Sequence, residues 1–373
     1  MARLRQALRW ALGTLGMLLL LVVFFSTIVL LVAYGFRGEC SVPEHQNVSV
    51  QPSNRTDLAA VPGYVRPGKT TYLTFPEWYI VYSAREYAAY LSMPADPSSF
   101  EYFRSVGRFW CGYRAVNAEL SPDSGKTFMD TVMLFVIGGS YSVEYTVKGG
   151  YEATLGRVSE LIGGADTPED RFYAAYADSY ARFLDETPWY DYPFGTTFVH
   201  FWETPTRCPL NLRSCERRIV YSVEFLLKTA YAHGIAYATH ASYTPANLTT
   251  MLLVSNVPGA LADDGRIRVV QTFEDGPAII EVPRYQEFTR LMRELASARA
   301  NILDFAGNDG IVVSVIVPPG EHYGVVEGTI FLTMSTASDR GQRLLLEVPA
   351  KDFSAFIRHT LSHGYTLEHV YDY

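Results

Sequence analysis

The chain has 373 residues, of which 48% are hydrophobic, 14% aromatic and 19% charged. This composition excludes a largely disordered chain, which would be rich in charge and poor in aromatic rings, and the length allows about two domains. With 39 acidic and 31 basic residues, a net charge of −8 and no basic block, the chain lacks the basic footprint that a nucleic-acid partner requires.

The amino terminus, residues 1–37, predicts a cytoplasmic tip and a membrane anchor. An uncharged apolar run extends from Trp10 to Ala33, and a helix rising about 1.5 Å per residue over this length spans the hydrocarbon core of a bilayer. The run is longer than the apolar centre of a signal peptide, although the small residues Ala33 and Gly35 leave cleavage as an alternative. Three arginines precede the run and only Arg37 follows it closely, so we expect a cytoplasmic amino terminus and an exported remainder.

Residues 38–63 are rich in polar residues and proline, lack apolar periodicity and predict an extracytoplasmic stalk. The four cysteines fit an oxidising compartment. Cys208 and Cys215 bracket a short loop that a disulfide can close, and Cys40 and Cys111 then pair by elimination. The alternative, four free thiols in a reducing cytoplasm, is disfavoured by the arginines that precede the apolar run.

Residues 64–247 have the pattern of a helical domain. Thr74-Phe75-Pro76-Glu77 has the sequence of a capping box and predicts a helix start, and Thr167-Pro168-Glu169-Asp170 predicts another. The aromatic excess of the chain belongs here, because 36 of its 52 aromatic residues lie between Tyr64 and Tyr243.

Two long segments of this domain carry most of its helical periodicity. Lys126 to Leu161 predicts one helix, or two joined at a glycine pair. Charged residues on it are spaced for salt bridges along one face: Glu144, Lys148 and Glu152. Glu216 to Ser242 predicts a long helix with an apolar stripe that we expect to face the core. That stripe consists of Ile219, Val220, Val223, Leu226, Leu227, Ala230, Tyr231, Tyr237 and Ala238.

Residues 248–373 change to a strand pattern interrupted by two helices, which predicts an α+β domain. The expected strands are Met251–Val254, Ile267–Phe273, Ala278–Val282, Ile302–Phe305, Ile311–Val317, Thr329–Met334, Arg343–Val348 and Leu367–Val370. Ile279–Pro283 and Leu345–Pro349 match at an offset of 66, and the helices that follow match at 65. The repeated strand-helix-strand unit suggests a ferredoxin-like βαβ duplication, with coincidence of so short a match as the alternative.

Motifs for nucleotides, common nucleophiles and metals are incomplete or missing. Ser124-Gly125-Lys126-Thr127 ends like a phosphate loop, but Leu120 stands where that motif needs its first glycine. The sequence contains no G-x-S-x-G, S-x-x-K or H-E-x-x-H motif. His359 and His363 have the spacing of zinc ligands, with His369 nearby, but a solvated helix end is the favoured interpretation. We therefore expect no nucleotide, no cofactor and no metal.

Four residues of the helical domain are candidate catalytic groups. His233 and His240 lie two turns apart on the long helix, and His200 and Glu203 lie three apart on the preceding segment. A histidine oriented by a carboxylate suits general acid–base catalysis near neutral pH. The alternative for these residues is a polar seam between packed helices.

A dense aromatic cluster includes Trp189, Tyr190, Tyr192 and Trp202. Large rings with polar tips suit contact with a glycan, a lipid headgroup or a protein, so these four are candidate ligand-binding residues. The alternative is that they belong to the core.

The sequence therefore predicts a single-pass protein of a bacterial inner membrane, with the bulk of the chain in the periplasm. We expect a non-catalytic envelope protein that binds a partner protein or an amphiphilic lipid or glycan ligand. The alternative is a periplasmic hydrolase with histidine and carboxylate groups in the helical domain. Bacterial origin is itself an inference, because Asn47, Asn54 and Asn247 lie in glycosylation triplets that a eukaryotic secretory protein uses.

Overall fold

The computed structural model describes residues 50–93, 96–120, 126–242, 248–257, 265–274, 276–324, 328–337 and 340–373, together with residues 27, 28, 31, 34, 35, 38, 40–42 and 259. Most of the predicted anchor, Trp10 to Ala33, lies outside the described residues, as do Asn47 and Asn247. Among the helices that are described, none has both the length and the apolar character needed to cross a bilayer.

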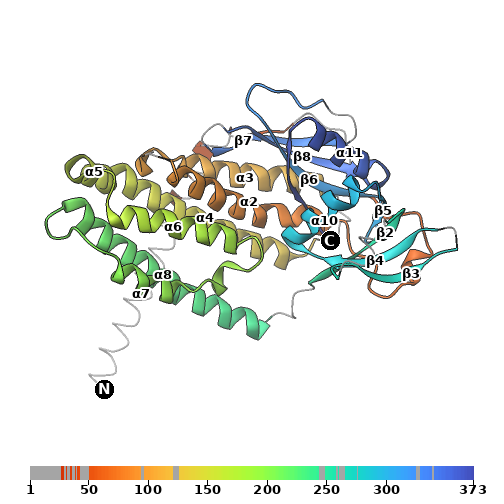
Figure 1. Ribbon diagram of the computed structural model, residues 1–373, viewed down its shortest axis with the longest axis horizontal. Coiled ribbons are helices and arrows are strands. Elements are labelled where there is room, and N and C mark those ends of the chain that lie inside the picture. Colours follow the sequence, from red (N-terminus) through yellow and green to blue (C-terminus); the bar gives the residue numbers. More distant parts are fainter. Residues whose placement is uncertain are drawn as a thin grey trace, which may run out of the picture.

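A bundle of helices forms the first part of the described chain. Its helices are α2 (Lys69–Leu91), α3 (Tyr102–Glu119), α4 (Phe128–Tyr151), α5 (Arg157–Gly163), α6 (Pro168–Phe183), α7 (Phe194–Glu203) and α8 (Leu212–Ser242). A π-helical turn (Glu152–Gly156) joins α4 to α5. Short 3₁₀ turns lie at Leu58–Ala60, Pro97–Ser99 and Trp189–Asp191. The bundle occupies one end of the molecule, and the strands occupy the other (Figure 1).

The two predicted helix starts have different outcomes. Thr167 caps α6 as expected, because its hydroxyl accepts a hydrogen bond from a backbone N–H in the first turn. The capping box predicted at Thr74 is wrong, since α2 begins at Lys69 and Pro76 lies inside the helix. Tyr72, which precedes the predicted start, is buried. Tertiary packing therefore extends the helix upstream of its local signal.

The long helix α8 forms as predicted, but its apolar stripe does not face the core. Five large side chains of that stripe are at least half exposed: Ile219, Val223, Leu226, Leu227 and Tyr237. The buried side of α8 consists of Tyr221 and Phe225, with charged residues beside them that pair with neighbouring helices. The prediction of a core-facing stripe is therefore wrong, because ion pairs between helices turn the charged side inward.

Two antiparallel sheets follow the bundle, and the strands predicted after residue 248 are all present within a few residues of their expected ends. The first sheet contains, in spatial order, β3 (Arg268–Thr272), β4 (Ala278–Pro283), β2 (Thr249–Ser255) and β5 (Asn301–Phe305). The second contains β1 (Cys40–Ser41), β7 (Thr329–Ser335), β8 (Gln342–Pro349), β6 (Gly310–Val317) and β9 (Thr366–Val370). A helical bundle followed by two sheets confirms the α+β class.

The strands β2 to β5 and the strands β6 to β9 are arranged in the same way. The spatial order is β3-β4-β2-β5 in the first set and β7-β8-β6-β9 in the second. In both sets the second strand along the chain lies at one edge, followed by the third, the first and the fourth. In each set a helix, α10 (Tyr285–Ser297) or α11 (Ala350–Ser362), connects the third strand to the fourth. Leu252 pairs with Ile280 in the first sheet, as Val313 pairs with Leu346 in the second. The common order agrees with the sequence match between β4 and β8.

Buried clusters join the parts of the described chain. One cluster contains residues of both sheets and of α10 and α11. Another combines the bundle with one face of the second sheet, where the Tyr82 hydroxyl lies 2.8 Å from the Tyr371 hydroxyl. The Tyr72 hydroxyl donates to Glu347 Oε2 across the same interface, at 2.8 Å. The bundle therefore packs directly on the second sheet.

Both predicted disulfides are present, Cys40–Cys111 and Cys208–Cys215, and no cysteine is free. Two disulfides are typical of an oxidising, extracytoplasmic compartment. Cys40 also begins β1, which pairs with the edge strand β7. Within the predicted stalk, Leu58 is buried in a cluster with Leu253 of the first sheet. The domain boundaries at residues 37, 63 and 247 remain predictions.

Candidate functional site

The four predicted catalytic residues occupy separate positions. His200 and Glu203 are exposed near the end of α7, and His233 is exposed on α8. Nδ1 of His233 donates to the backbone oxygen of Thr229, 2.7 Å away. The side chain of His240 lies outside the described residues.

The packing of α7 on α8 shows how far apart these residues lie. Arg218 of α8 donates to the backbone oxygen of Phe201, 2.6 Å away, so the end of α7 lies beside Arg218. His233 follows Arg218 by 15 residues on the same helix, or about 22 Å. The structure therefore does not bring His200 and Glu203 together with His233, and a catalytic role for these residues remains a prediction.

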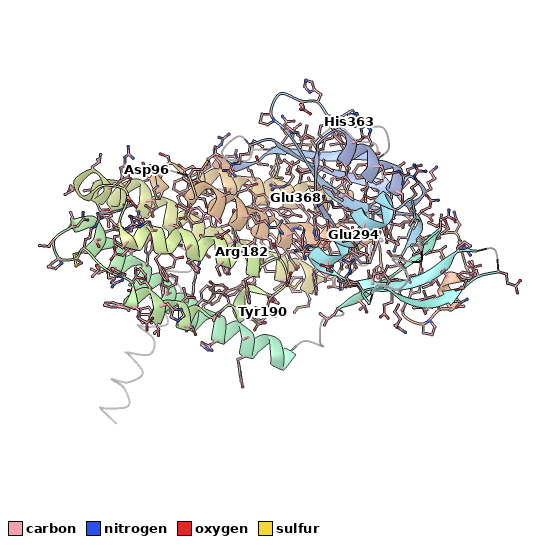
Figure 2. All side chains as sticks on the ribbon, in the orientation of Figure 1. Asp96, Arg182, Tyr190, Glu294, His363 and Glu368 are labelled. Atoms are coloured by element: carbon pink, nitrogen blue, oxygen red, sulfur yellow. A yellow bond between two sulfur atoms is a disulfide. The ribbon has the colours of Figure 1, made fainter. Side chains whose placement is uncertain are left out.

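The four predicted ligand-binding aromatics are also divided. Tyr192 is buried in the core, and Trp189 stacks on Tyr231 with ring centroids 5.1 Å apart. Tyr190 is half-buried beside them, at the edge of the bundle (Figure 2). Trp202 lies near the far end of α7, about 12 Å along that helix from Phe194, where its Nε1 donates to Ser222 Oγ at 3.1 Å. Trp202 is thus separated from the other three along α7, and ligand binding by these residues remains a prediction.

Of the histidines with zinc-like spacing, two lie together near a helix end and the third is buried elsewhere. His359 and His363 lie near the end of α11 with ring centroids 4.0 Å apart. His369 is buried on β9, where it stacks on Trp78 at 3.7 Å and where burial lowers its pKa well below the usual value. Within the described parts of the chain, no three His, Cys, Asp or Glu side chains are grouped closely enough to hold a metal ion.

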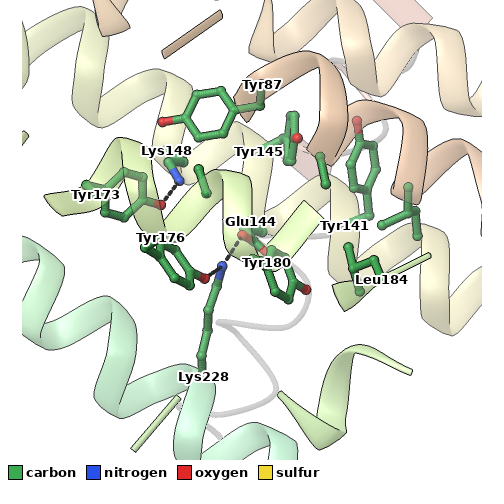
Figure 3. A pocket seen from close by; sticks show the side chains of 13 residues that line it. Tyr87, Tyr141, Glu144, Tyr145, Lys148, Tyr173, Tyr176, Tyr180, Leu184 and Lys228 are labelled. Carbon is green, nitrogen blue, oxygen red and sulfur yellow. Dashed lines mark hydrogen bonds and ion pairs between the residues drawn. The ribbon is translucent and has the colours of Figure 1, made fainter. Parts of the chain in front are cut away.

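A tyrosine-lined cavity lies between α2, α4, α6 and α8 (Figure 3). Six tyrosine rings and three charged side chains make up most of its wall: Tyr87, Tyr141, Tyr145, Tyr173, Tyr176, Tyr180, Glu144, Lys148 and Lys228. The cavity volume is about 50 Å³, which is room for roughly three water molecules.

The charged side chains at this cavity form one connected cluster with Glu224. Lys228 Nζ lies 2.9 Å from Glu144 Oε1 and 3.0 Å from Glu224 Oε1. Lys148 Nζ lies 3.5 Å from the same Glu224 oxygen. The Tyr173 hydroxyl donates to that oxygen as well, at 2.7 Å. Glu224 therefore bridges two lysines that come from different helices.

Burial and pairing set the protonation of the cluster. Burial lowers the pKa of Lys148. Burial also lowers the pKa of Lys228, but Glu144 and Glu224 outweigh it and hold that pKa well above its usual value. Burial would raise the pKa of Glu224, but the two lysines lower it to about 2. Glu224 is therefore ionised at neutral pH and is the shared partner of the two lysines.

The chemistry available to this cavity is limited by its small volume. The Lys148 amine lies 4.6 Å from the centres of both the Tyr87 and Tyr173 rings, which shield it. A space for a few waters excludes an organic ligand unless the helices separate. The cavity therefore supports a hydrated structural junction between α4 and α8 better than it supports a substrate site.

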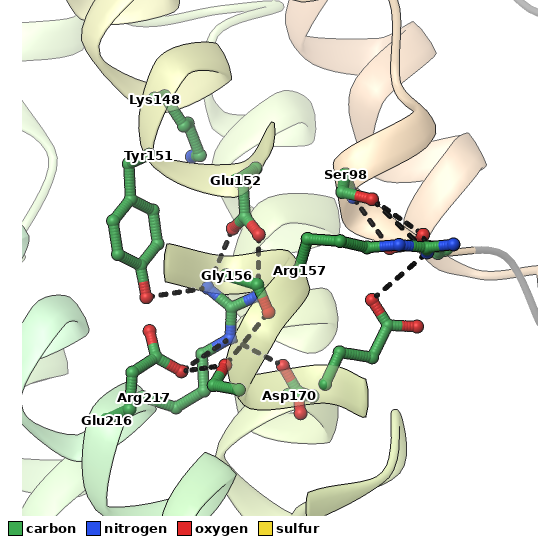
Figure 4. A network of polar contacts seen from close by, with 12 residues as sticks. Ser98, Lys148, Tyr151, Glu152, Gly156, Arg157, Asp170, Glu216 and Arg217 are labelled. Atoms are coloured by element: carbon green, nitrogen blue, oxygen red, sulfur yellow. Dashed lines mark hydrogen bonds and ion pairs between the residues drawn. The ribbon is translucent and has the colours of Figure 1, made fainter. Parts of the chain in front are cut away.

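A second buried network continues this junction toward the π-helical turn (Figure 4). Arg217 makes a bidentate pair with Glu152, with both N–O distances 2.7 Å, and its Nε lies 3.1 Å from Asp170 Oδ1. Arg213 donates to the backbone oxygen of Gly156 at 2.7 Å. Both guanidinium groups are fully buried. The π-helical turn thus places a backbone carbonyl where a buried arginine uses it.

We call the line along which α4 and α8 meet the α4–α8 seam. It is defined by one hydrogen bond, Ser140–Tyr231, and by three ion pairs, Glu144–Lys228, Lys148–Glu224 and Glu152–Arg217. The acidic and basic partners exchange helices from one ion pair to the next. The two helices are antiparallel, because residue numbers rise along one helix as they fall along the other. The charged residues predicted to pair with one another along α4 pair across this seam instead.

The sides of both helices that flank the seam face outward and are almost free of charge. A helix turns by about 100° per residue. The residues that lie neither in the seam nor against the core are therefore the ones that face outward. The outward residues of α4 are Met129, Val132, Val136, Gly139, Val143, Val147 and Gly150. Those of α8 are Leu212, Glu216, Ile219, Val223, Leu226, Leu227, Ala230, Gly234 and Tyr237. We call these two described stripes the apolar face, and Glu216 is the single ionisable carboxyl in it.

The apolar face is large and open. Val147 is 51% exposed and Leu227 is 65% exposed. The stripes span 22 residues on α4 and 26 on α8, or about 30 to 38 Å, and packed helix axes lie about 9 Å apart. Exposed apolar residues continue beyond α4, at Leu155, Val158, Leu161 and Ile162. Monomeric soluble proteins rarely expose a continuous apolar patch above a few hundred Å².

Glu216 lies at the buried edge of the α8 stripe, where its side chain is only 16% exposed and lies beside Arg217. Burial raises its pKa to about 7, although neighbouring Arg217 lowers it. Its Oε2 accepts a hydrogen bond from Ser159 Oγ at 2.9 Å. The Glu216 carboxyl is therefore turned toward Ser159 and Arg217 and away from the exposed apolar residues.

The seam and the apolar face were missed from sequence, although a signal for them exists. Arg213, Arg217, Glu224 and Lys228 recur at helical spacing on one side of α8, and their signs complement those of the charged residues on α4 when the two helices are antiparallel. Two complementary charged stripes predict that these sides meet, which leaves the apolar sides outside.

Comparison of the chain with protein-family models, with curated proteins and with solved structures gave no match.

Proposed function

We propose that the protein is a membrane-anchored, extracytoplasmic binding protein that acts without catalysis and engages its partner or an amphiphilic ligand through the apolar face. The apolar face is the observation that carries this proposal. Valine and leucine are exposed over two long helices, while the charged residues of those helices pair with one another across the seam. This is the reverse of a surface adapted to water.

The location proposed for this function is a bacterial inner membrane. A single anchor formed by the apolar run from Trp10 to Ala33, with a cytoplasmic amino terminus, leaves the bulk of the chain in the periplasm. Two disulfides in the exported part support this orientation.

We also propose that the two sets of strands are a duplicated ferredoxin-like unit. Read from the other edge, their order is fourth, first, third and second strand, which is the antiparallel arrangement of the split βαβ fold. A helix follows the third strand in both halves, at the positions that match in sequence. Such units serve many functions, so the bundle rather than the sheets directs the binding proposal.

The alternative function, a hydrolase that uses His200, Glu203, His233 and His240, has no observation in its favour. The first three residues lie at separate places in the bundle, as described above. The cavity beside Lys148, with a volume of about 50 Å³, is also small for a substrate.

Site-specific photo-cross-linking tests the binding proposal. A benzophenone amino acid placed at Leu227 or Val147 of the full chain in native membranes is expected to form discrete adducts. The same probe at Ala175, an exposed position on α6 outside the apolar face, is the matched control. If the adducts at Leu227 and Val147 do not differ from those at Ala175, the apolar face is not a binding surface.

A further inference from the structure

We propose that the apolar face lies on the lipid bilayer that holds the amino-terminal anchor. The inference rests on the proposed anchor and binding function, and it adds the identity of the occupant. In this arrangement the exported part does not extend away from the membrane on a stalk. Its α4–α8 seam runs parallel to the membrane surface instead.

The length of chain between the anchor and the fold supports this arrangement. Only six residues separate Ala33, the last residue of the apolar run, from Cys40. However these residues are arranged, they bridge at most about 25 Å. Cys40 is bonded to Cys111 of α3 and begins β1 at the edge of the second sheet. The fold is therefore held next to the bilayer at that point.

The point of attachment is also close to the apolar face. Trp110, the neighbour of Cys111 on α3, contacts Phe135 of α4 with ring centroids 5.4 Å apart. Phe135 lies next to Val136, which belongs to the outward stripe of α4. One helix thus separates the tethered disulfide from the start of the face, so a short tether and a membrane-facing α4 are compatible.

The chemistry of the apolar face suits acyl chains better than charged headgroups. Its two stripes contain no lysine or arginine, whereas surfaces that bind anionic lipids depend on such residues. The charged residues of α4 and α8 are paired across the seam, beneath the face. Tyr231 and Tyr237 are exposed toward the carboxyl end of α8, and tyrosine is the ring that membrane interfaces favour.

This chemistry also predicts how binding depends on conditions. An apolar contact without basic residues is insensitive to ionic strength. It is equally insensitive to the fraction of anionic lipid, which distinguishes it from electrostatic attachment.

Spin labels at single introduced cysteines test the proposal in the full chain. All four native cysteines are in disulfides, so a cysteine replacing Val147 or Leu227 is the only free thiol. The protein is placed in lipid nanodiscs, and collisions of each label with oxygen and with a water-soluble nickel complex are compared. Ala175→Cys is the matched control, and circular dichroism of each variant reports whether the fold is kept.

The proposal predicts that oxygen accessibility exceeds nickel accessibility at positions 147 and 227. It predicts the reverse at position 175, with the same ratios in zwitterionic and anionic discs. Nickel access at 147 and 227 equal to that at 175 would overturn the bilayer contact. Labels shielded from both reagents would also overturn it, and would show that a second copy or another part of the chain covers the face. In that last case the proposed binding function stands, whereas loss of the discrete cross-links described above would remove it.

Discussion

Replacing Glu224 with glutamine is expected to lower the free energy of unfolding by about 3 kcal/mol at pH 7. The side chain is mostly buried, and Lys148 and Lys228 overcome the effect of burial to lower its pKa from 4.5 to about 2. Each tenfold change in proton affinity corresponds to about 1.4 kcal/mol. The ionised carboxylate therefore contributes about 3 kcal/mol, and its loss leaves two buried ammonium groups without their shared partner.

The pH dependence of this effect has a definite sign. A carboxyl whose pKa is lower in the folded state stabilises the fold above its unfolded pKa, and that contribution is lost as pH falls through the folded pKa. The difference in unfolding free energy between the native chain and the Glu224→Gln variant has its maximum value, about 3 kcal/mol, above about pH 5. It falls to about 1.4 kcal/mol at pH 3 and vanishes below pH 2.

Urea unfolding of the full chain in a non-ionic detergent, followed by tryptophan fluorescence, measures this difference. Glu144→Gln is the matched control, because that carboxylate pairs with the same Lys228 but its side chain is 45% exposed. A half-exposed ion pair contributes less than about 1 kcal/mol to the free energy of unfolding. Equal losses in the two variants, or a Glu224→Gln loss that is unchanged between pH 7 and pH 3, would refute the reasoning.

Three further predictions concern the interfaces that hold the fold together. Burial raises the pKa of Glu347 from 4.5 to about 7. The contribution of Glu347 to the unfolding free energy therefore declines as pH rises from 4.5 to 7. Glu347→Gln is expected to remove that decline and to raise the urea midpoint of unfolding at pH 8. A methyl group at Gly138 would lie 2.3 Å from Phe109, whereas one at Gly139 meets open space, so Gly138→Ala is expected to lower the unfolding free energy by about 1 to 3 kcal/mol while Gly139→Ala does not; equal stability of the two would contradict this packing. Opening the disulfide of Cys40, which closes a loop with a separation of 71 residues, is expected to lower stability by about 4 kcal/mol, against about 2 for that of Cys208, with a separation of 7; serine pairs compared by urea titration test this order.

The strand half of the fold was predictable because its signals are local. Alternating and β-branched runs bounded by turns mark strands such as β6 and β8, and the match between β4 and β8 indicates that the two halves share one arrangement. The pairing of Cys208 with Cys215 was predictable for the same reason, because a short loop leaves little choice of partner.

The helical half was harder to predict because its arrangement is decided between helices. The apolar stripe of α8 has the pattern of a core stripe, and only the partners of Arg217, Glu224 and Lys228 on other helices show that it faces outward. The distance between His200 and His233 is likewise set by where α7 ends on α8, which no single-helix pattern contains. Contacts with other parts of the fold also decide where α2 begins. The sequence around Thr74 predicts a helix start there, but the helix begins at Lys69 and includes the buried Tyr72.

The most direct test of the central claim is quenching of a fluorescent label on Leu227→Cys by lipids that carry a doxyl group on the acyl chain. If the apolar face lies on the bilayer, the label in nanodiscs is quenched strongly by acyl-chain doxyl and weakly by aqueous iodide, and the Ala175→Cys control shows the opposite. Quenching of both labels by iodide alone would contradict the account.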